Sequence, residues 1–258
     1  MNVIFRNIKL VYEYVVLYGG LFCFALMCLA WSLAAGLLHR LLPKKLGTRL
    51  GQYAIMLGFR AYLSAVRASG LVKCDLTALD VLRDEQSLII TTNHPSLIDI
   101  VLIASRLPRA VCILKADLVD NPLLGGAARM AGYIRNDFGG SLIRRSMEAA
   151  QSGSQLLIFP EGTRTVHPPI NDFKDGFGLI ARKAGAPIQT VFIEASSTFL
   201  GKDWPLSRKP DFPVEYRVRL GRRFEVSGDV KAFVADFENY YRQQLTQVPQ
   251  ANPQELRS

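Results

Sequence analysis

The longest hydrophobic stretch of the chain lies near its beginning. Positions 14–38 carry no charged residue and consist mostly of Leu, Val, Ala, Phe and Cys. At about 1.5 Å per helical residue, this stretch is long enough to cross a hydrocarbon core of roughly 30 Å. The pattern therefore predicts a membrane-anchoring helix. A second apolar stretch at 53–66, interrupted by Arg60, leaves a shallow or re-entrant helical pair as the alternative.

From residue 87 onward, short β-like runs alternate with helical patterns. The expected strands are 87–92, 110–114, 155–159, 188–193 and 214–220. The expected helices are 97–107, 177–184, which Gly185 and Pro187 end, and 230–245. The buried stripe expected on the last helix is Phe233, Phe237, Tyr240 and Tyr241. Such alternation predicts an α/β fold with a mixed, largely parallel sheet flanked by helices.

The net charge of the chain is positive. Lys and Arg outnumber Asp and Glu by 31 to 22, which gives the 258 residues a net charge of +9. This balance suits an anionic partner such as a membrane surface, a phosphorylated substrate or nucleic acid, and charge alone does not choose among them. Nucleic acid is not expected, because no recognised binding module accompanies the charge. The three histidines and four cysteines show no metal-ligand spacing and no disulfide framework, so we expect no metal and no bound cofactor.

Basic residues cluster immediately after the first apolar stretch. They are His39, Arg40, Lys44, Lys45 and Arg49. By the positive-inside tendency, they place the following domain on the cytoplasmic side of an inner membrane. The same cluster argues against a cleaved export signal, since positive charge at this place opposes export.

The first candidate for chemistry follows the expected strand 87–92. Residues 93–99 read Asn-His-Pro-Ser-Leu-Ile-Asp. Because Pro favours the first helical position, we expect a helix from Pro95 with His94 just outside it. Two residues five apart within one helix point about 140° away from each other, so only a His94 in the turn can reach Asp99. The pair is then a general base and its orienter, while Ser96 is expected to cap the local backbone.

A second polar loop follows the expected strand 155–159. Residues 159–164 read Phe-Pro-Glu-Gly-Thr-Arg. Gly162 allows the backbone to approach a ligand closely, and Arg164 offers a planar fork suited to phosphate or carboxylate. The alternative is an ion pair between Glu161 and Arg164 that only pins the loop.

The two segments, in this order and separation, resemble the first and third motifs of the glycerolipid acyltransferase family. The resemblance covers residues 87–194. It implies an α/β acyltransferase domain that moves a fatty acyl group directly from acyl-CoA or acyl carrier protein. The implied acceptor is the hydroxyl of a lysophospholipid, above all 1-acyl-sn-glycerol-3-phosphate, which gives phosphatidic acid.

The resemblance also implies roles for individual residues. His94 is the implied base and Asp99 its partner. The implied substrate-binding residues are Asn93, Lys115, Arg135, Glu161, Gly162, Thr163, Arg164 and Pro187. Among these, Arg164 holds an acceptor phosphate and Pro187 shapes the acyl-donor side. The Gly162 N–H is one possible donor to the oxyanion that forms during attack.

One position departs from the family pattern. The second family motif usually ends in an Asp-Arg pair, whereas Phe138 occupies the place of that arginine here, with Arg135 as a neighbouring substitute. The acceptor therefore stays open, with lyso-ornithine lipid or a specialised secondary lipid as alternatives. A catalytically silent membrane-binding relative is a further alternative.

The expected organisation has three parts. Residues 1–70 form a membrane-anchoring helical region and 71–248 the catalytic domain. Residues 249–258, which are polar and contain Pro253, form a frayed tail.

Overall fold

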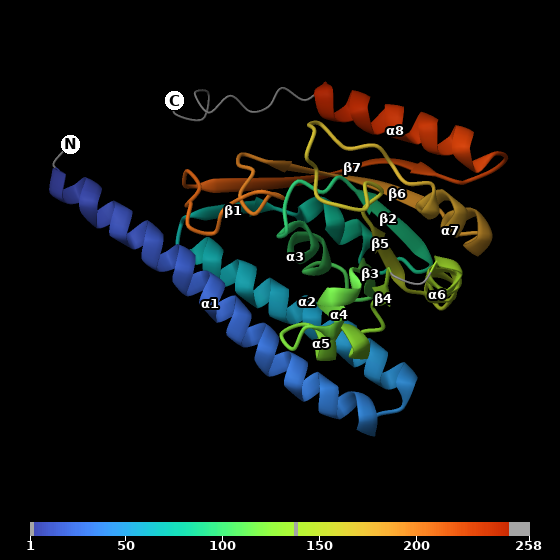
Figure 1. Ribbon diagram of the computed structural model, residues 1–258, viewed down its shortest axis with the longest axis horizontal. Helices are drawn as coiled ribbons and strands as arrows, with labels where there is room; N and C mark the ends of the chain where they lie inside the picture. Colours follow the sequence, from blue (N-terminus) through green and yellow to red (C-terminus); the bar gives the residue numbers. More distant parts are fainter. Residues whose placement is uncertain (1–2, 137–138, 248–258) are drawn as a thin grey trace.

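A helical hairpin opens the fold. The computed structural model describes residues 3–136 and 139–247, so the expected tail at 249–258 lies outside the described residues. Helix α1 (Val3–Leu41) is followed by α2 (Lys44–Ala68), which folds back along it (Figure 1). Pro43 lies at the turn, immediately before α2. A backbone N–H at the beginning of a helix has no acceptor within the helix, so proline, which lacks this group, loses no hydrogen bond there. By length and composition α1 can cross a membrane, and α2 lies beside it as a second helix. Whether the two helices span a membrane or lie in it as a shallow pair stays a prediction.

A seven-stranded sheet forms the centre of the rest of the chain. The strands are β1 (Val72–Asp75), β2 (Leu88–Thr92), β3 (Ala110–Leu114), β4 (Ile134–Arg135), β5 (Gln155–Ile158), β6 (Ile188–Ala195) and β7 (Val214–Phe224). Their order is β1-β7-β6-β2-β5-β3-β4, and every neighbouring pair is parallel except β6 with β7. The mixed, largely parallel sheet predicted from the sequence is confirmed.

Helices cover both faces of this sheet (Figure 1). After the 3-10 helix Thr77–Leu82 they are α3 (Asp99–Ala104), α4 (Ala116–Asp120), α5 (Gly125–Met130), α6 (Gly139–Gln151), α7 (Gly176–Ala184) and α8 (Val230–Thr246). Strand β2 shows how the layers are built, because its side chains alternate between two buried clusters. Leu88 and Ile90 pack with α3 on one face, and Ile89 packs with α7 and α8 on the other.

The end of α7 was predicted correctly from the sequence, whereas the buried face of α8 was predicted only in part. Helix α7 ends as expected at Gly185, which adopts a left-handed conformation with φ of 63°. On α8 the expected stripe is shifted, because Val234, Phe237 and Tyr241 are the buried residues. Phe233 and Tyr240 are half-buried at its edge, where they contact Phe224 of β7.

A glycine lets the hairpin pack closely on the α/β domain. The N–H of Gly126 on α5 donates to Ser32 Oγ on α1 at 2.9 Å, and a Cβ at Gly126 would overlap the Ser32 carbonyl oxygen. Gly126→Ala is expected to cost about 1–3 kcal/mol of stability, because packed backbone has little room to move. Chemical unfolding in detergent measures this cost. Gly140→Ala is the matched control, since a Cβ there meets open space, and equal stability of the two variants would contradict the expectation.

Candidate active site

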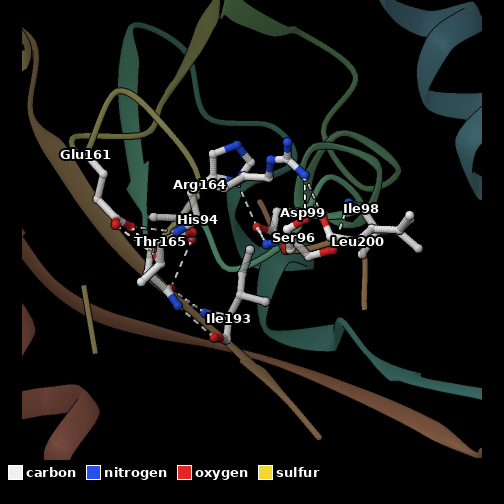
Figure 2. A network of polar contacts seen from close by, with 12 residues as sticks. His94, Ser96, Ile98, Asp99, Glu161, Arg164, Thr165, Ile193 and Leu200 are labelled. Carbon is white, nitrogen blue, oxygen red and sulfur yellow. Dashed lines mark hydrogen bonds and ion pairs between the residues drawn. The ribbon is translucent and has the colours of Figure 1, made fainter. Parts of the chain in front are cut away.

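The two predicted motifs meet at one edge of the sheet. Strands β2, β5 and β6 are parallel, so the loops after β2 and β5 leave the same edge. The backbone N–H of His94 donates to the Glu161 carboxylate at 2.9 Å, and Thr165 N–H donates to the His94 carbonyl at 2.7 Å (Figure 2). The first loop is thus bonded directly to the second.

His94 and Asp99 form the expected pair. The Nδ1 of His94 is 2.8 Å from Oδ2 of Asp99. Asp99 is fully buried, whereas the His94 side chain is 15% exposed. Within the described residues Nε2 of His94 has no protein partner, so this nitrogen is free to meet a substrate hydroxyl. The geometry is that of a base held in one orientation by a carboxylate.

An aromatic ring also fixes the imidazole. Phe159, the last residue before Pro160 in the second motif, stacks on His94 with ring centroids 3.8 Å apart and planes 22° apart. The sequence places Phe159 at a strand end but does not reveal this partner. The stack and the hydrogen bond to Asp99 together restrict the rotation of the His94 side chain.

Burial dominates the electrostatics of Asp99. It raises the pKa of this carboxyl above its ordinary value of 3.8, against the opposing effects of the His94 and Ser96 hydrogen bonds and of the Arg164 charge. Within the described residues Oδ1 of Asp99 has no partner. A poorly solvated carboxylate gains more from a neighbouring positive charge than a solvated one does. Asp99 therefore favours a His94 that has just accepted a proton.

The helix after His94 starts later than predicted. It begins at Asp99, not at Pro95. The reason is that the intervening N–H groups have other acceptors. Ser96 N–H donates to Asp99 Oδ2 at 2.8 Å, and Leu97 N–H donates to the Leu200 carbonyl at 3.1 Å. These bonds hold 95–98 as a turn that brings Asp99 under His94.

Ser96 has the structural role expected of it. Its Oγ donates to the Phe199 carbonyl at 2.6 Å and accepts from the Ile98 N–H at 3.3 Å. The residue is completely buried. The hydroxyl therefore ties the turn to a distant loop.

Glu161 is a buried organiser of the two loops. Its carboxylate accepts hydrogen bonds from His94 N–H, from Thr165 Oγ1 and from Asn171 N–H. Burial raises its pKa, while the backbone bonds from Asn171 and His94 act in the opposite direction. The alternative of a Glu161–Arg164 ion pair is not what forms.

Arg164 points back toward the pair instead. Its Nη1 donates to the carbonyls of Leu200 and Gly201 at 2.9 and 2.7 Å, and Figure 2 shows the guanidinium drawn together with His94 and Asp99. Its charge lowers the pKa of Asp99, which places the two groups within electrostatic reach. Among the described residues the other guanidinium N–H groups have no acceptor. Arg164 can therefore hold an anion next to the base.

The remaining motif residues divide between structure and surface. Gly162 has a φ of 69°, but its N–H donates to the Phe159 carbonyl at 2.9 Å, so it is not free to stabilise an oxyanion. Thr163 is half-buried, and its hydroxyl has no hydrogen bond within the described residues.

Asn93 extends the sheet. Its amide donates to the Ile193 carbonyl at 2.9 Å and accepts the Ile193 N–H at 2.8 Å. These two bonds to β6 occupy a side chain that was expected to contact substrate. They fix the backbone immediately before His94.

Three other expected substrate residues belong to other strands or their ends. Lys115 follows β3 and is exposed, and Arg135 ends β4 and pairs with Asp120 at 2.8 Å, both at the same edge as His94. Pro187 is a correction, because its carbonyl accepts Ile89 N–H at the beginning of β2. At about 3.3 Å per strand residue it lies roughly 16 Å from the His94 edge. Phe138 lies outside the described residues.

A wide groove follows the site edge. It has a volume of about 2790 Å³ and runs beside Asn93, Pro95 and Thr165 toward the first turns of α1. Its wall includes basic side chains, among them Arg67 and Arg217. Within the described residues no group of His, Cys, Asp and Glu side chains could hold a metal ion.

Known proteins of similar sequence are acyltransferases. A family model described as Acyltransferase matches residues 73–194. A lyso-ornithine lipid O-acyltransferase of Pseudomonas aeruginosa is 34% identical over 134 residues, 47% of this chain and 52% of that protein. A chloroplastic 1-acyl-sn-glycerol-3-phosphate acyltransferase of Brassica napus is 30% identical over 125 residues, 46% of this chain and 36% of that protein. The chain thus matches about half or less of the length of these relatives.

A solved structure shares the fold over nearly the whole chain. The 1-acyl-sn-glycerophosphate acyltransferase of Thermotoga maritima superposes with a TM-score of 0.68 at 16% identity, covering 94% of this chain and 97% of that one. The matched residues 73–194 contain both motifs and the His94–Asp99 pair. Residues 73–194 therefore form an acyltransferase domain that is similar to the glycerolipid acyltransferases.

Proposed function

We propose that this protein transfers a fatty acyl group from acyl-CoA or acyl carrier protein to the hydroxyl of a lysophospholipid. The acceptor that fits best is 1-acyl-sn-glycerol-3-phosphate, and the product is then phosphatidic acid. The observation that carries the proposal is the 2.8 Å pair of His94 and Asp99, with Nε2 of His94 open beside Arg164. This arrangement serves a reaction in which a hydroxyl loses its proton next to an anionic group.

The reaction needs no covalent enzyme intermediate. Nε2 of His94 takes the proton of the acceptor hydroxyl as its oxygen attacks the thioester carbonyl. The Asp99 carboxylate stabilises the imidazolium that forms. The carbon–sulfur bond then breaks, the new ester remains, and the leaving thiolate receives the proton from His94. One proton thus moves from the hydroxyl to the thiol, and the resting base is restored.

Ser96→Ala tests the absence of a covalent intermediate. We expect the variant to keep its activity within about tenfold, because it loses only the bonds to Phe199 and Ile98. Two measurements check this: the turnover rate of the variant, and intact-protein mass spectrometry of the wild type, which detects any acyl adduct. Complete loss of activity together with a wild-type acyl adduct on Ser96 would contradict direct transfer.

Arg164 is the group proposed to bind the acceptor's charge. Only its Nη1 is bonded to protein within the described residues, so the rest of the planar fork can pair with phosphate. A lyso-ornithine lipid, which carries a carboxylate, is the second candidate acceptor. The P. aeruginosa relative with that name supports it, as does the absence of an arginine at Phe138.

The hairpin is proposed to hold the domain on a membrane. The domain contacts α1 at Glu13, Tyr18 and Ser32, a span of about 28 Å along the helix axis. This span is nearly the thickness of a hydrocarbon core, which a polar domain cannot occupy. Helix α1 therefore lies along the membrane surface. The apolar residues it exposes include Ile4, Phe5, Ile8, Val11, Val15, Phe22, Leu33 and Leu37.

An acceptor panel tests the proposed function. Purified protein with acyl-CoA or acyl carrier protein is expected to acylate lysophosphatidic acid faster than lyso-ornithine lipid. Arg164→Gln is expected to raise the KM for either acceptor by about tenfold to a hundredfold, since a charge-assisted hydrogen bond contributes about 1.5–3 kcal/mol. Preference for lyso-ornithine lipid would select the second candidate. Liposome binding with no thioester consumption across the panel would indicate a silent membrane-binding protein.

A further inference from the structure

Glu13 is a buried carboxylate in the first third of α1. It is 5% exposed, and its Oε2 lies 2.8 Å from Nζ of Lys209, with Lys9 at 3.8 Å from Oε1. A buried carboxylate in a membrane-bound helix is costly unless it is paired, so its partner is informative. Lys209 belongs to the loop of residues 196–213 that joins β6 to β7, called here the β6–β7 loop.

A second bond fixes the same loop to the same helix. The hydroxyl of Tyr18 on α1 donates to the carbonyl of Leu206 at 3.0 Å. The outer end of the β6–β7 loop is thus held at two points by the helix that faces the membrane.

Trp204 links the outer end of the loop to its inner end. Its indole Nε1–H donates to the Arg208 carbonyl at 2.8 Å, and its backbone N–H donates to the Gly201 carbonyl at 3.2 Å. The Arg208 guanidinium lies 4.5 Å above the indole, and the ring of Phe199 meets it edge-on at 5.9 Å. These contacts make residues 199–209 one connected unit.

The inner end of this unit holds Arg164. The carbonyls of Leu200 and Gly201 are the acceptors of its Nη1, and Figure 2 shows Arg164 beside Leu200. The Leu200 carbonyl also accepts Leu97 N–H from the turn after His94. Leu200 has a φ of 59°, a conformation that side-chain-bearing residues rarely adopt. Such a conformation persists where its surroundings determine it.

We infer that Glu13, Lys209 and Trp204 are positioning residues for Arg164. The chain of contacts runs from Glu13 to Lys209, through the peptide of Arg208 to Trp204, and from Gly201 to Arg164. The position of α1 against the domain therefore determines the orientation of the Arg164 side chain, which binds the acceptor's anionic group. This inference rests on the proposed role of Arg164 in acceptor binding.

The test uses the full-length protein in detergent or lipid with lysophosphatidic acid. Lys209→Met is expected to raise the KM for this acceptor about tenfold, while the KM for the acyl donor and kcat stay within about twofold. Tenfold corresponds to about 1.4 kcal/mol. Trp204→Phe, which keeps an aromatic ring but removes the Nε1–H, is expected to act in the same direction. A purely structural defect would instead lower kcat and active protein without separating the two KM values.

Three further variants keep the test decisive. Glu13→Gln combined with Lys209→Met removes both charges, so it folds without an unpaired buried charge and should still raise the acceptor KM. Lys209→Arg keeps the positive charge beside Glu13, so its acceptor KM should equal that of the wild type. Lys202→Met is the matched control, because Lys202 is exposed on the same loop and has no partner among the described residues.

The outcomes separate this inference from the proposed function. A selective rise in acceptor KM for Lys209→Met, the double variant and Trp204→Phe, with Lys202→Met unchanged, supports the inference. If Lys209→Met, the double variant and Trp204→Phe all have wild-type kinetics while Arg164→Gln raises the acceptor KM, the inference is overturned and the proposed function is left intact. A wild-type protein that transfers no acyl group overturns both.

Discussion

Replacing His94 with alanine is expected to lower the rate of acyl transfer by about 10²- to 10⁴-fold, the contribution of a positioned general base. The reason is that the side chain supplies Nε2, the only nitrogen of the pair that faces away from Asp99. Release of free thiol from the acyl donor, followed with purified protein and lysophosphatidic acid, measures the effect. Binding of the acceptor should change little, because the variant keeps Arg164.

His167→Ala is the matched control for this variant. His167 is exposed in the loop after the second motif and its side chain has no hydrogen bond within the described residues. Its replacement should leave the rate unchanged. If both histidine variants stayed folded and lost activity equally, the assignment of the base would be contradicted.

Asp99→Asn is expected to lower the rate by about 10³-fold or more. The same change in a serine protease triad costs about 10⁴-fold, since an amide cannot hold the imidazole in the required tautomer. Here the amide would also fail to stabilise the imidazolium, which the buried carboxylate does. The measurement is kcat/KM for the acceptor at neutral pH. A loss of less than tenfold would show that Asp99 does not orient His94.

The stability of Asp99→Asn should change with pH in a defined direction. Burial raises the pKa of Asp99 above 3.8, so from about pH 4 up to the raised pKa the folded protein binds more protons than the unfolded chain. Wild-type stability is therefore lost as pH rises through this window. The variant lacks this effect and should gain stability relative to the wild type over the same range. Thermal unfolding at a series of pH values tests this, and a relative loss with rising pH would contradict it.

The contact between His94 and Asp99 could be predicted because its geometry is local. Pro95 and the five-residue spacing left one arrangement in which His94 reaches Asp99, and the 2.8 Å contact confirms it. The helix start could not be predicted in the same way. It depends on Leu200, about a hundred residues later, which accepts the N–H of Leu97.

Other features of the site could not be predicted from the sequence because they depend on contacts between residues far apart in the chain. Asn93 and Glu161 belong to the expected motifs, yet their side chains are bonded to Ile193 and to neighbouring backbone, pairings that no local pattern encodes. Strands β1 and β4 were not expected, because four and two residues carry too little periodicity to read. Pro187 was placed with the site by family resemblance, whereas strand direction puts it at the opposite edge.

The most direct test is thiol release from acyl-CoA on vesicles that contain lysophosphatidic acid, with wild-type protein and His94→Ala compared side by side. We predict that the wild type releases thiol and forms phosphatidic acid in equal amounts, and that the folded variant does so at least a hundredfold more slowly. Equal rates for the two proteins, or thiol release without phosphatidic acid, would contradict activation of the acceptor hydroxyl by His94.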